Sequence, residues 1–224
     1  MKLLLAAATA PEISPFISHL EQKWASPDPG VYKKDIHEIH ICVTGVGLVA
    51  TTYAVTKALH RHSYDFVLQA GVSGSFDTTI DLGQLVLVQS EQFGDLGAED
   101  HENYLDIFDM GLLQPEAYPF TDGKLDTPLH EIPFPFKLLT VSGISVNTVS
   151  GHAATIAMRD HKFGAQVESM EGAALHYVCL QEHVPFAQIR AISNYVEPRD
   201  KSKWKMKEAI IALNKWLIDF SASL

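Results

Sequence analysis

Short apolar runs of strand type alternate with segments of helical periodicity along this chain, and this alternation is the feature that most restricts its fold. Lys2–Ala7 and Asp65–Ala70 are examples of the apolar runs, and Leu48–Arg61 continues as a helix after a glycine break. Strands separated by helices usually lie parallel in one sheet that helices cover on both faces. We therefore predict an α/β fold, a three-layer α/β/α arrangement around a central mixed, mainly parallel twisted sheet. The chain of 224 residues is expected to form a single domain, 1–224.

The apolar periodicity and the glycines and prolines that interrupt it give the order of the expected elements. Strands are expected at Lys2–Ala7, Val31–Thr44, Asp65–Ala70, Leu82–Ser90, Phe136–Ser142, Ala165–Glu168 and Pro185–Ser193. Helices are expected at Ser14–Trp24, Leu48–Arg61, Gly151–Lys162, Gly172–Gln181 and Lys203–Phe220. Residues 91–136 contain many acids, five prolines and little periodicity. We interpret them as a long excursion with a short helix, forming a lid or an oligomer contact.

Charge and composition exclude several classes of partner. The formal net charge of −10 disfavours binding to nucleic acids or to anionic membranes, and no apolar stretch is long enough to cross a membrane. The first twelve residues have the outline of a secretory signal, but they carry a single Lys2 and are shorter than the roughly 15–30 residues of such signals. A buried first strand and a cytoplasmic location are therefore expected. Cys42 and Cys179 lie in apolar contexts typical of reduced thiols.

Polar or flexible residues follow six of the expected strands. In α/β folds, ligands bind outside the carboxyl ends of the strands, so these segments can converge on one small molecule. Each one also has an ordinary structural explanation: a tight turn for the glycine segments, a first-turn helix acid for the glutamates, and a cap or turn for the Ser-Asn pair. The first glycine segment lacks the third glycine of a dinucleotide fingerprint and the lysine of a P-loop. The segments are Thr9–Glu12, Gly45–Gly47, Gly71–Gly74, Gly143–Asn147, Ser169–Glu171 and Ser193–Asn194.

The order of these motifs resembles the purine nucleosidase and phosphorylase superfamily along nearly the whole chain. The motifs read AATAPEI, TGVGLVA, QAGVSGS, DLGQLVLV, VSGISVN, ESMEGAALHYVC and VPFAQIRAISN. Within the superfamily the chain is most similar to the hydrolase branch, which includes methylthioadenosine/S-adenosylhomocysteine nucleosidase and futalosine hydrolase. The SMEGAA box and the RAISNYVEPR ending look most like futalosine hydrolases. The resemblance implies a nucleoside phosphorylase-like fold, an N-glycosyl hydrolase activity and a homo-oligomer with active sites near the contact.

The resemblance also assigns roles to four residues around the ribose. Cleavage of an N-ribosidic bond passes through an oxocarbenium-like sugar cation, which nearby anions stabilise. By similarity, Glu171 binds the ribose hydroxyls and Met170 packs against the sugar. Glu12 corresponds to the acid that activates or orients the attacking water. Arg190 matches the arginine that helps to hold that water and its carboxylate.

The base is expected to contact Asn194 and the segment around Val146. Related nucleosidases that cleave aminopurines have an aspartic acid at the position of Asn194. A carboxamide cannot act as a strong general acid, but it offers a donor and an acceptor together, which suits a 6-oxopurine such as hypoxanthine. Further substrate contacts are expected from the strand-end residues Ser73, Gly74 and Ser193.

Water, rather than phosphate, is the expected nucleophile. A phosphorylase must hold a dianion, usually with arginines and open backbone amides. The chain has four arginines, none of them lies in the expected loop Thr9–Ile13, and Glu12 in that loop would repel phosphate. The eleven histidines are scattered without the spacing of a metal site, so neither a metal nor a cofactor is expected.

The resemblance therefore implies a futalosine hydrolase, which would release hypoxanthine and dehypoxanthinyl futalosine in menaquinone biosynthesis. Futalosine carries a carboxyphenyl group on its 5′ extension, and the sequence does not identify the cationic or polar partner that this group needs. Three alternatives stay open. The first two are a methylthioadenosine/S-adenosylhomocysteine nucleosidase and a 6-oxopurine nucleoside phosphorylase. The third is a non-catalytic nucleoside-binding protein on the same scaffold, because a fold does not fix a function.

Overall fold

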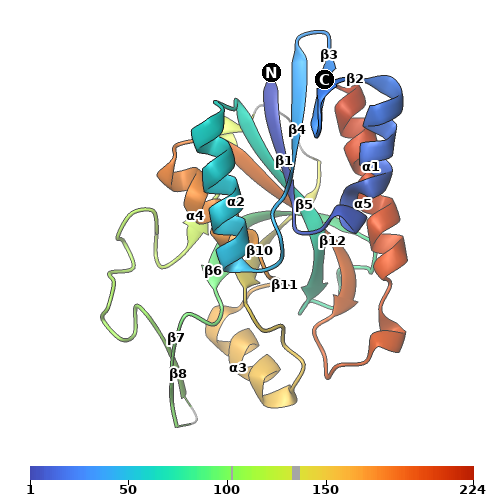
Figure 1. Cartoon of the computed structure of the whole chain (residues 1–224). Coiled ribbons are helices and arrows are strands. Elements are labelled where there is room, and N and C mark those ends of the chain that lie inside the picture. Colours follow the sequence, from blue (N-terminus) through green and yellow to red (C-terminus); the bar gives the residue numbers. More distant parts are fainter. Residues whose placement is uncertain (102, 133–136) are drawn as a thin grey trace.

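The computed structural model describes residues 1–101, 103–132 and 137–224, which form a mixed α/β fold (Figure 1). The helices are α1 (Ala10–Lys23), α2 (Leu48–Arg61), α3 (Ala153–Phe163), α4 (Gly172–Gln181) and α5 (Met206–Ala222), with short 3₁₀ turns η1 (Leu129–Glu131) and η2 (Lys201–Lys203). The strands are β1 (Lys2–Ala7), β2 (Ala25–Asp28), β3 (Val31–Lys34), β4 (His37–Val43), β5 (Phe66–Ser75), β6 (Leu85–Phe93), β7 (Gly97–Asp100), β8 (Asn103–Asp106), β9 (Leu125–Asp126), β10 (Leu139–Ser145), β11 (Val167–Ser169) and β12 (Phe186–Tyr195).

One sheet organises the described part of the chain, in the order β11-β10-β6-β12-β5-β1-β4-β3-β2, with β9 beside β6. Strand β11 pairs with β10 on one side and with β5 on the other, so the β5–β12–β6–β10–β11 end of the sheet closes on itself. Five of the ten strand pairings described for this sheet are parallel and five are antiparallel. The sheet is therefore mixed, and the parallel share is half.

Helices cover both faces of the sheet, which gives three layers (Figure 1). Strand β1 shows why, because successive side chains of a strand point to opposite faces. Leu3 and Leu5 join the apolar cluster that contains Phe16 of α1 and Leu213 of α5. The intervening residues Leu4 and Ala6 belong to a second cluster with side chains of α2 and α4.

Several element boundaries agree with those expected, and others differ for identifiable reasons. Strand β1 and helices α2 and α4 have the expected limits. Helix α1 begins at Ala10 instead of Ser14, because Thr9 precedes it as N-cap and Pro11 is tolerated in a first turn. The expected strand Val31–Thr44 is a hairpin of β3 and β4, which turns at Asp35 with a φ of 52°.

The glycine segment Gly71–Gly74 is not a turn. Strand β5 continues through it to Ser75 and pairs with β12 from Val67 to Ser75. The residues expected to follow the strand are therefore its last part, and not the loop after it. The same holds for Ser193–Asn194, which lies inside β12.

The described residues of the segment 91–136 are less irregular than expected. This segment holds the end of β6, the β7–β8 hairpin and β9, and its short helix is the three-residue turn η1. The expected start of the next strand, Phe136, lies outside the described residues, and β10 begins at Leu139. None of the helices formed by the described residues is long and apolar enough to span a membrane.

Candidate active site

A cavity of about 470 Å³ opens where β1, β5, β11 and β12 end and where α1 and α5 begin. Its volume lies in the range of sites that hold small molecules. The closure of the sheet through β11 brings segments together that are more than 150 residues apart in sequence. Seven of the nine residues expected at a site line this cavity: Glu12, Ser73, Gly74, Met170, Glu171, Ser193 and Asn194.

Glu171 stands between β11 and α4 with its side chain turned into the cavity wall. It is 5% exposed, and its Oε1 accepts a hydrogen bond from the Gly47 backbone N–H at 3.1 Å. Gly47 has a φ of 92°, a conformation that favours glycine, so the Gly45–Gly47 segment serves to aim an N–H at the carboxylate. The second oxygen, Oε2, accepts from Arg190 Nη1 at 3.4 Å. Both oxygens are thus oriented by donors.

Arg190 lies behind the cavity and is not part of its lining. The residue is 1% exposed, and its side chain donates to the Val72 carbonyl at 3.2 Å and to Ser169 Oγ at 3.3 Å. A Cβ on Gly71 would lie 2.7 Å from Arg190 Nη1 and 3.1 Å from Glu12 Oε1. Glycine at this position therefore allows the guanidinium to lie close to the strand. Arg190 acts on the cavity through Glu171.

Glu12 is the third residue of α1 and the second buried acid of the cavity. Its Oε2 accepts from the Thr9 backbone N–H and from Thr9 Oγ1, both at 2.9 Å, and its Oε1 accepts from the Val72 N–H at 3.2 Å. The segment Thr9–Ile13, expected to be a loop, is the first turn of α1. Glu12 occupies the position at this helix end that favours an anion. It is therefore both a first-turn acid and a cavity residue.

Asn194 presents a fixed amide to the cavity. Its Oδ1 accepts from Ser193 Oγ at 2.9 Å, and its Nδ2 donates to the Tyr195 carbonyl at 3.0 Å. Ser193 Oγ also lies 3.1 Å from the Ser73 carbonyl, which ties the pair to β5. A Cβ on Gly74 would lie 3.2 Å from Asn194 Nδ2. The amide keeps one N–H and one lone pair for a ligand.

The structure does not place Val146 in the cavity. Val146 is fully buried, and its backbone N–H donates to the Ser169 carbonyl at 3.0 Å, so this N–H is already engaged. Val149, three residues later, lines the cavity instead. Which of these residues lines the cavity depends on the path that the chain takes after β10. The local sequence pattern does not reveal this path.

Four residues near the end of the chain line the cavity but were not expected from the sequence. They follow β12 and extend into α5: Arg199, Trp204, Met206 and Ile210. The Arg199 guanidinium lies over the Trp204 ring, 5.0 Å from its centroid. An arginine and a tryptophan shortly after a polar strand end are a signal that could have indicated them.

One further acid, Glu168, lines the cavity but is neutralised locally. Its Oε2 lies 3.2 Å from Arg159 Nη1, and its Oε1 accepts from the Ser150 backbone N–H at 2.7 Å. These contacts tie the chain after β10 to β11. Among the described residues, no group of three His, Cys, Asp or Glu side chains is arranged to hold a metal ion.

Fold and cavity together define an α/β protein with a small-molecule site at the carboxyl ends of its strands, lined by two oriented carboxylates and an amide. The chain belongs to the Phosphorylase superfamily, whose family model matches residues 2–221. The futalosine hydrolase of Streptomyces coelicolor is 32% identical over 70% of this chain and 65% of its own length, a little under two thirds. The futalosine hydrolase of Thermus thermophilus is 32% identical over 76% of this chain and 75% of its own length.

A nucleosidase is also similar in sequence, and solved structures share the fold. The 5′-methylthioadenosine/S-adenosylhomocysteine nucleosidase of Psychromonas ingrahamii is 28% identical over 79% of this chain and 77% of its own length. The native structure of futalosine hydrolase from Helicobacter pylori superposes with a TM-score of 0.77 at 18% identity, covering 100% of this chain and 98% of that one. At this identity the superposition establishes the fold alone.

Proposed function

We propose that this protein is a futalosine hydrolase, which cleaves the N-ribosidic bond of futalosine with water and releases hypoxanthine and dehypoxanthinyl futalosine. The observation that carries the proposal is the combination of two oriented carboxylates, Glu12 and Glu171, with the neutral amide of Asn194 in one cavity. The similarity to two futalosine hydrolases at 32% identity supports it. Residues 1–224 act as one domain in this proposal, which the family match over 2–221 supports.

In the proposed mechanism, Glu171 binds the ribose hydroxyls and stabilises the positive charge that develops on the sugar. Arg190 orients this carboxylate from behind, at 3.4 Å. Glu12 is held by three hydrogen-bond donors and accepts a proton from the attacking water. Met170 packs against the sugar from the same strand-to-helix junction.

Asn194 selects the base in this proposal. Its carboxamide has one N–H and one lone pair left, so it can donate to a 6-oxo group and accept from the N7–H of the leaving base. Ser193 and Ser73 fix its orientation, and Gly74 leaves it room. An adenine nucleoside bound here would meet the Asn194 amide and no carboxylic acid that could protonate its base. This disfavours the methylthioadenosine alternative.

Hydrolysis is favoured over phosphorolysis by the charges at the cavity. Arg190 is already paired with Glu171, and Glu12 fills the anion-favouring position at the start of α1. Arg199 is the one basic side chain among the described residues of the lining. A phosphate dianion would therefore meet two carboxylates and few free donors.

Arg199 and Trp204 are the proposed partners of the carboxyphenyl group on the 5′ extension. The guanidinium lies over the indole ring at 5.0 Å, and both side chains line the cavity. An aromatic ring can pack on the indole while its carboxylate pairs with the guanidinium. This supplies the cationic partner that the sequence did not identify.

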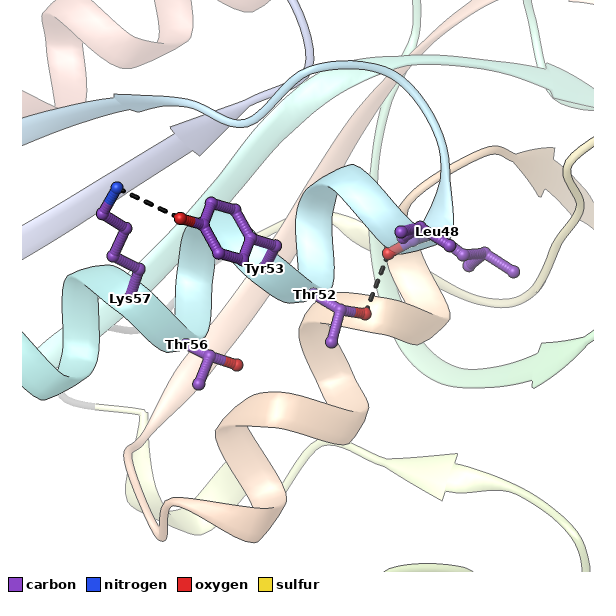
Figure 2. A pocket seen from close by; sticks show the side chains of 6 residues that line it. Leu48, Thr52, Tyr53, Thr56 and Lys57 are labelled. Atoms are coloured by element: carbon purple, nitrogen blue, oxygen red, sulfur yellow. Dashed lines mark hydrogen bonds between the residues drawn. The ribbon is translucent and has the colours of Figure 1, made fainter.

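The proposal includes assembly of this chain into a homo-oligomer. A second hollow, of about 550 Å³, lies on α2. Figure 2 shows Leu48, Tyr53 and Lys57, which line it. Its surroundings include exposed apolar side chains: Val49 is 82% exposed and Tyr53 is 66% exposed. Val46, which is 54% exposed, also lines the main cavity, so a partner on this face would lie next to the site. A cytoplasmic location is part of the proposal.

The test is the release of free base from futalosine, inosine and methylthioadenosine, each with and without phosphate, followed by chromatography. Futalosine should be cleaved fastest, and phosphate should not change the rate. Faster cleavage of methylthioadenosine would favour the nucleosidase, and a phosphate requirement would favour the phosphorylase. Binding without release would support the non-catalytic alternative.

A further inference from the structure

Glu91 is a buried carboxyl group directly behind the cavity, and none of the proposed chemistry uses it. It lies on β6 and is fully buried. Its Oε1 accepts from Gln188 Nε2 at 2.9 Å, and its Oε2 accepts from Ser145 Oγ at 3.0 Å. A Cβ on Gly172 would lie 1.9 Å from Glu91 Oε1. The glycine that follows Glu171 in the SMEGAA box is therefore required by the carboxyl group beneath it.

A chain of hydrogen bonds connects Glu91 to the cavity. Ser145 Oγ donates to Glu91, so it must accept from Ser169 Oγ, which is 3.2 Å away. Ser169 Oγ in turn accepts from Arg190 Nη2 at 3.3 Å, and Arg190 Nη1 donates to Glu171 at 3.4 Å. The protons between Arg190 Nη2 and Glu91 all point from the guanidinium toward Glu91, whereas the Nη1 proton points to Glu171. Arg190 is therefore held between two carboxyl groups, one in the cavity and one behind it.

Two unpaired atoms indicate the charge state that this network prefers. Among the described residues, Gln188 Oε1 and His176 Nε2 are buried without a hydrogen-bond partner. His176 Nδ1 lies 3.0 Å from the Leu125 carbonyl and must donate to it. Burial lowers the pKa of His176 to about 4, so the ring is neutral and Nε2 can only accept.

A half-turn of the Gln188 amide pairs both atoms. The amide nitrogen and oxygen are interchangeable in shape. The Gln188 side chain contacts both Glu91 and His176. After the turn, the amide donates to His176 Nε2, and its oxygen faces Glu91 Oε1. That contact is favourable when Glu91 carries a proton, whereas ionised Glu91 leaves the two atoms unpaired. Burial also raises the pKa of Glu91 to about 7, while the opposite charge of Arg190 lowers it and the like charge of Glu171 raises it.

We propose that Glu91 is a positioning residue that can gain and lose a proton. When Glu91 is neutral, Arg190 keeps its hydrogen bond to Glu171. When Glu91 is ionised, it draws Arg190 away from Glu171 through Ser145 and Ser169. The inference rests on the proposed function, because Glu171 is the group that it positions. The titratable groups that face Glu91 are Arg190 from β12, Glu171 from the β11–α4 junction and His176 from α4. Strands β9 and β10 face the network with Leu125 and Ser145, which do not titrate.

The experiment is the pH profile of kcat and of KM between pH 5.5 and 9 for the wild type and Glu91→Gln, with futalosine as substrate. Glutamine keeps the shape, and its amide donates to the turned Gln188, so this variant holds the network in its neutral form. The wild-type kcat should fall about tenfold per pH unit above about pH 7 while KM changes little. In Glu91→Gln this fall should be absent. An unchanged fall in Glu91→Gln, or a folded variant that is inactive at every pH, would overturn the inference.

Ser145→Ala is the second variant, in case Glu91→Gln does not fold. Loss of the hydroxyl removes one donor to ionised Glu91 and interrupts the link to Ser169, so the fall in kcat should become smaller and should move to higher pH. A fall of the wild-type size at the wild-type pH would contradict the proposed chain. The pH dependence of the unfolding temperature, compared between wild type and Glu91→Gln, reports the titration of Glu91 without any activity. If no nucleoside is cleaved, the proposed function fails, and this second measurement still shows whether Glu91 titrates.

Discussion

Replacement of Glu171 by glutamine removes one negative charge from the cavity and preserves the volume of the side chain. A carboxylate about 4 Å from a developing positive charge contributes about 4 kcal/mol at an effective dielectric constant of about 20. This corresponds to about a thousandfold in rate. We therefore expect kcat for Glu171→Gln to fall by about three orders of magnitude, with a smaller change in KM, because the charge develops in the transition state.

The same change also affects stability, and the assay must separate the two effects. Arg190 would lose the carboxylate at 3.4 Å and keep the Val72 carbonyl and Ser169 Oγ. Breaking a buried ion pair costs about 3–5 kcal/mol, which lowers the unfolding temperature of a chain of this size by roughly 10 °C. Activity is therefore measured by release of hypoxanthine from futalosine well below the unfolding temperature of the variant.

Glu168→Gln is the matched control for this loss of stability. Glu168 and Glu171 are each 5% exposed, and Glu168 is paired with the buried Arg159 at 3.2 Å. We expect a similar decrease in unfolding temperature but a rate loss at least ten times smaller. The electrostatic argument would be refuted if folded Glu171→Gln kept more than a tenth of the wild-type rate, or if Glu168→Gln lost as much activity.

Four further changes test the remaining parts of the site. Glu12→Gln should abolish hydrolysis yet leave nucleoside binding intact in calorimetry, and full activity would exclude Glu12 as the base. Asn194→Asp should raise the cleavage of adenine nucleosides relative to futalosine, and unchanged selectivity would contradict the argument about the base. Arg199→Gln should raise KM for futalosine about tenfold or more and leave KM for inosine, which has no carboxylate, nearly unchanged; equal effects on the two substrates would remove Arg199 from this role. The pKa of Glu91 is raised from 4.5 to about 7, so its contribution to stability is present below pH 4.5 and lost as the pH rises through about 7. Urea unfolding should show Glu91→Gln gaining about 3 kcal/mol relative to the wild type between pH 4.5 and pH 8, and a constant difference would refute the assignment.

The elements that the sequence predicted best have boundaries marked by neighbouring residues. Helix α2 follows a glycine with positive φ and ends near two basic residues, and α4 starts at a glycine directly after an acid. Strand β1 is a short apolar run that starts with a charged residue and ends shortly before a helix cap. Such signals act over a few residues and are readable from one sequence.

The elements that were predicted poorly depend on distant residues. Gly71 was expected to begin a turn because glycine usually interrupts a strand. Its real role is to leave space for Arg190 and Glu12, which come from β12 and α1. In the same way, the N–H of Val146 is engaged by Ser169 of β11. Neither relation can be recognised before the pairing of the strands is known.

The closed end of the sheet explains why the predicted site residues converge although their local structures were partly misjudged. Strand β11 pairs with both β10 and β5, so Ser145, Ser169 and Arg190 are enclosed in one small polar interior. A buried ion pair or carboxyl group seldom stabilises a protein more than apolar side chains of the same size would. The enclosed groups are nevertheless connected, one after another, to the Glu171 carboxylate. Their arrangement is therefore better explained by the orientation of that carboxylate than by the stability of the fold.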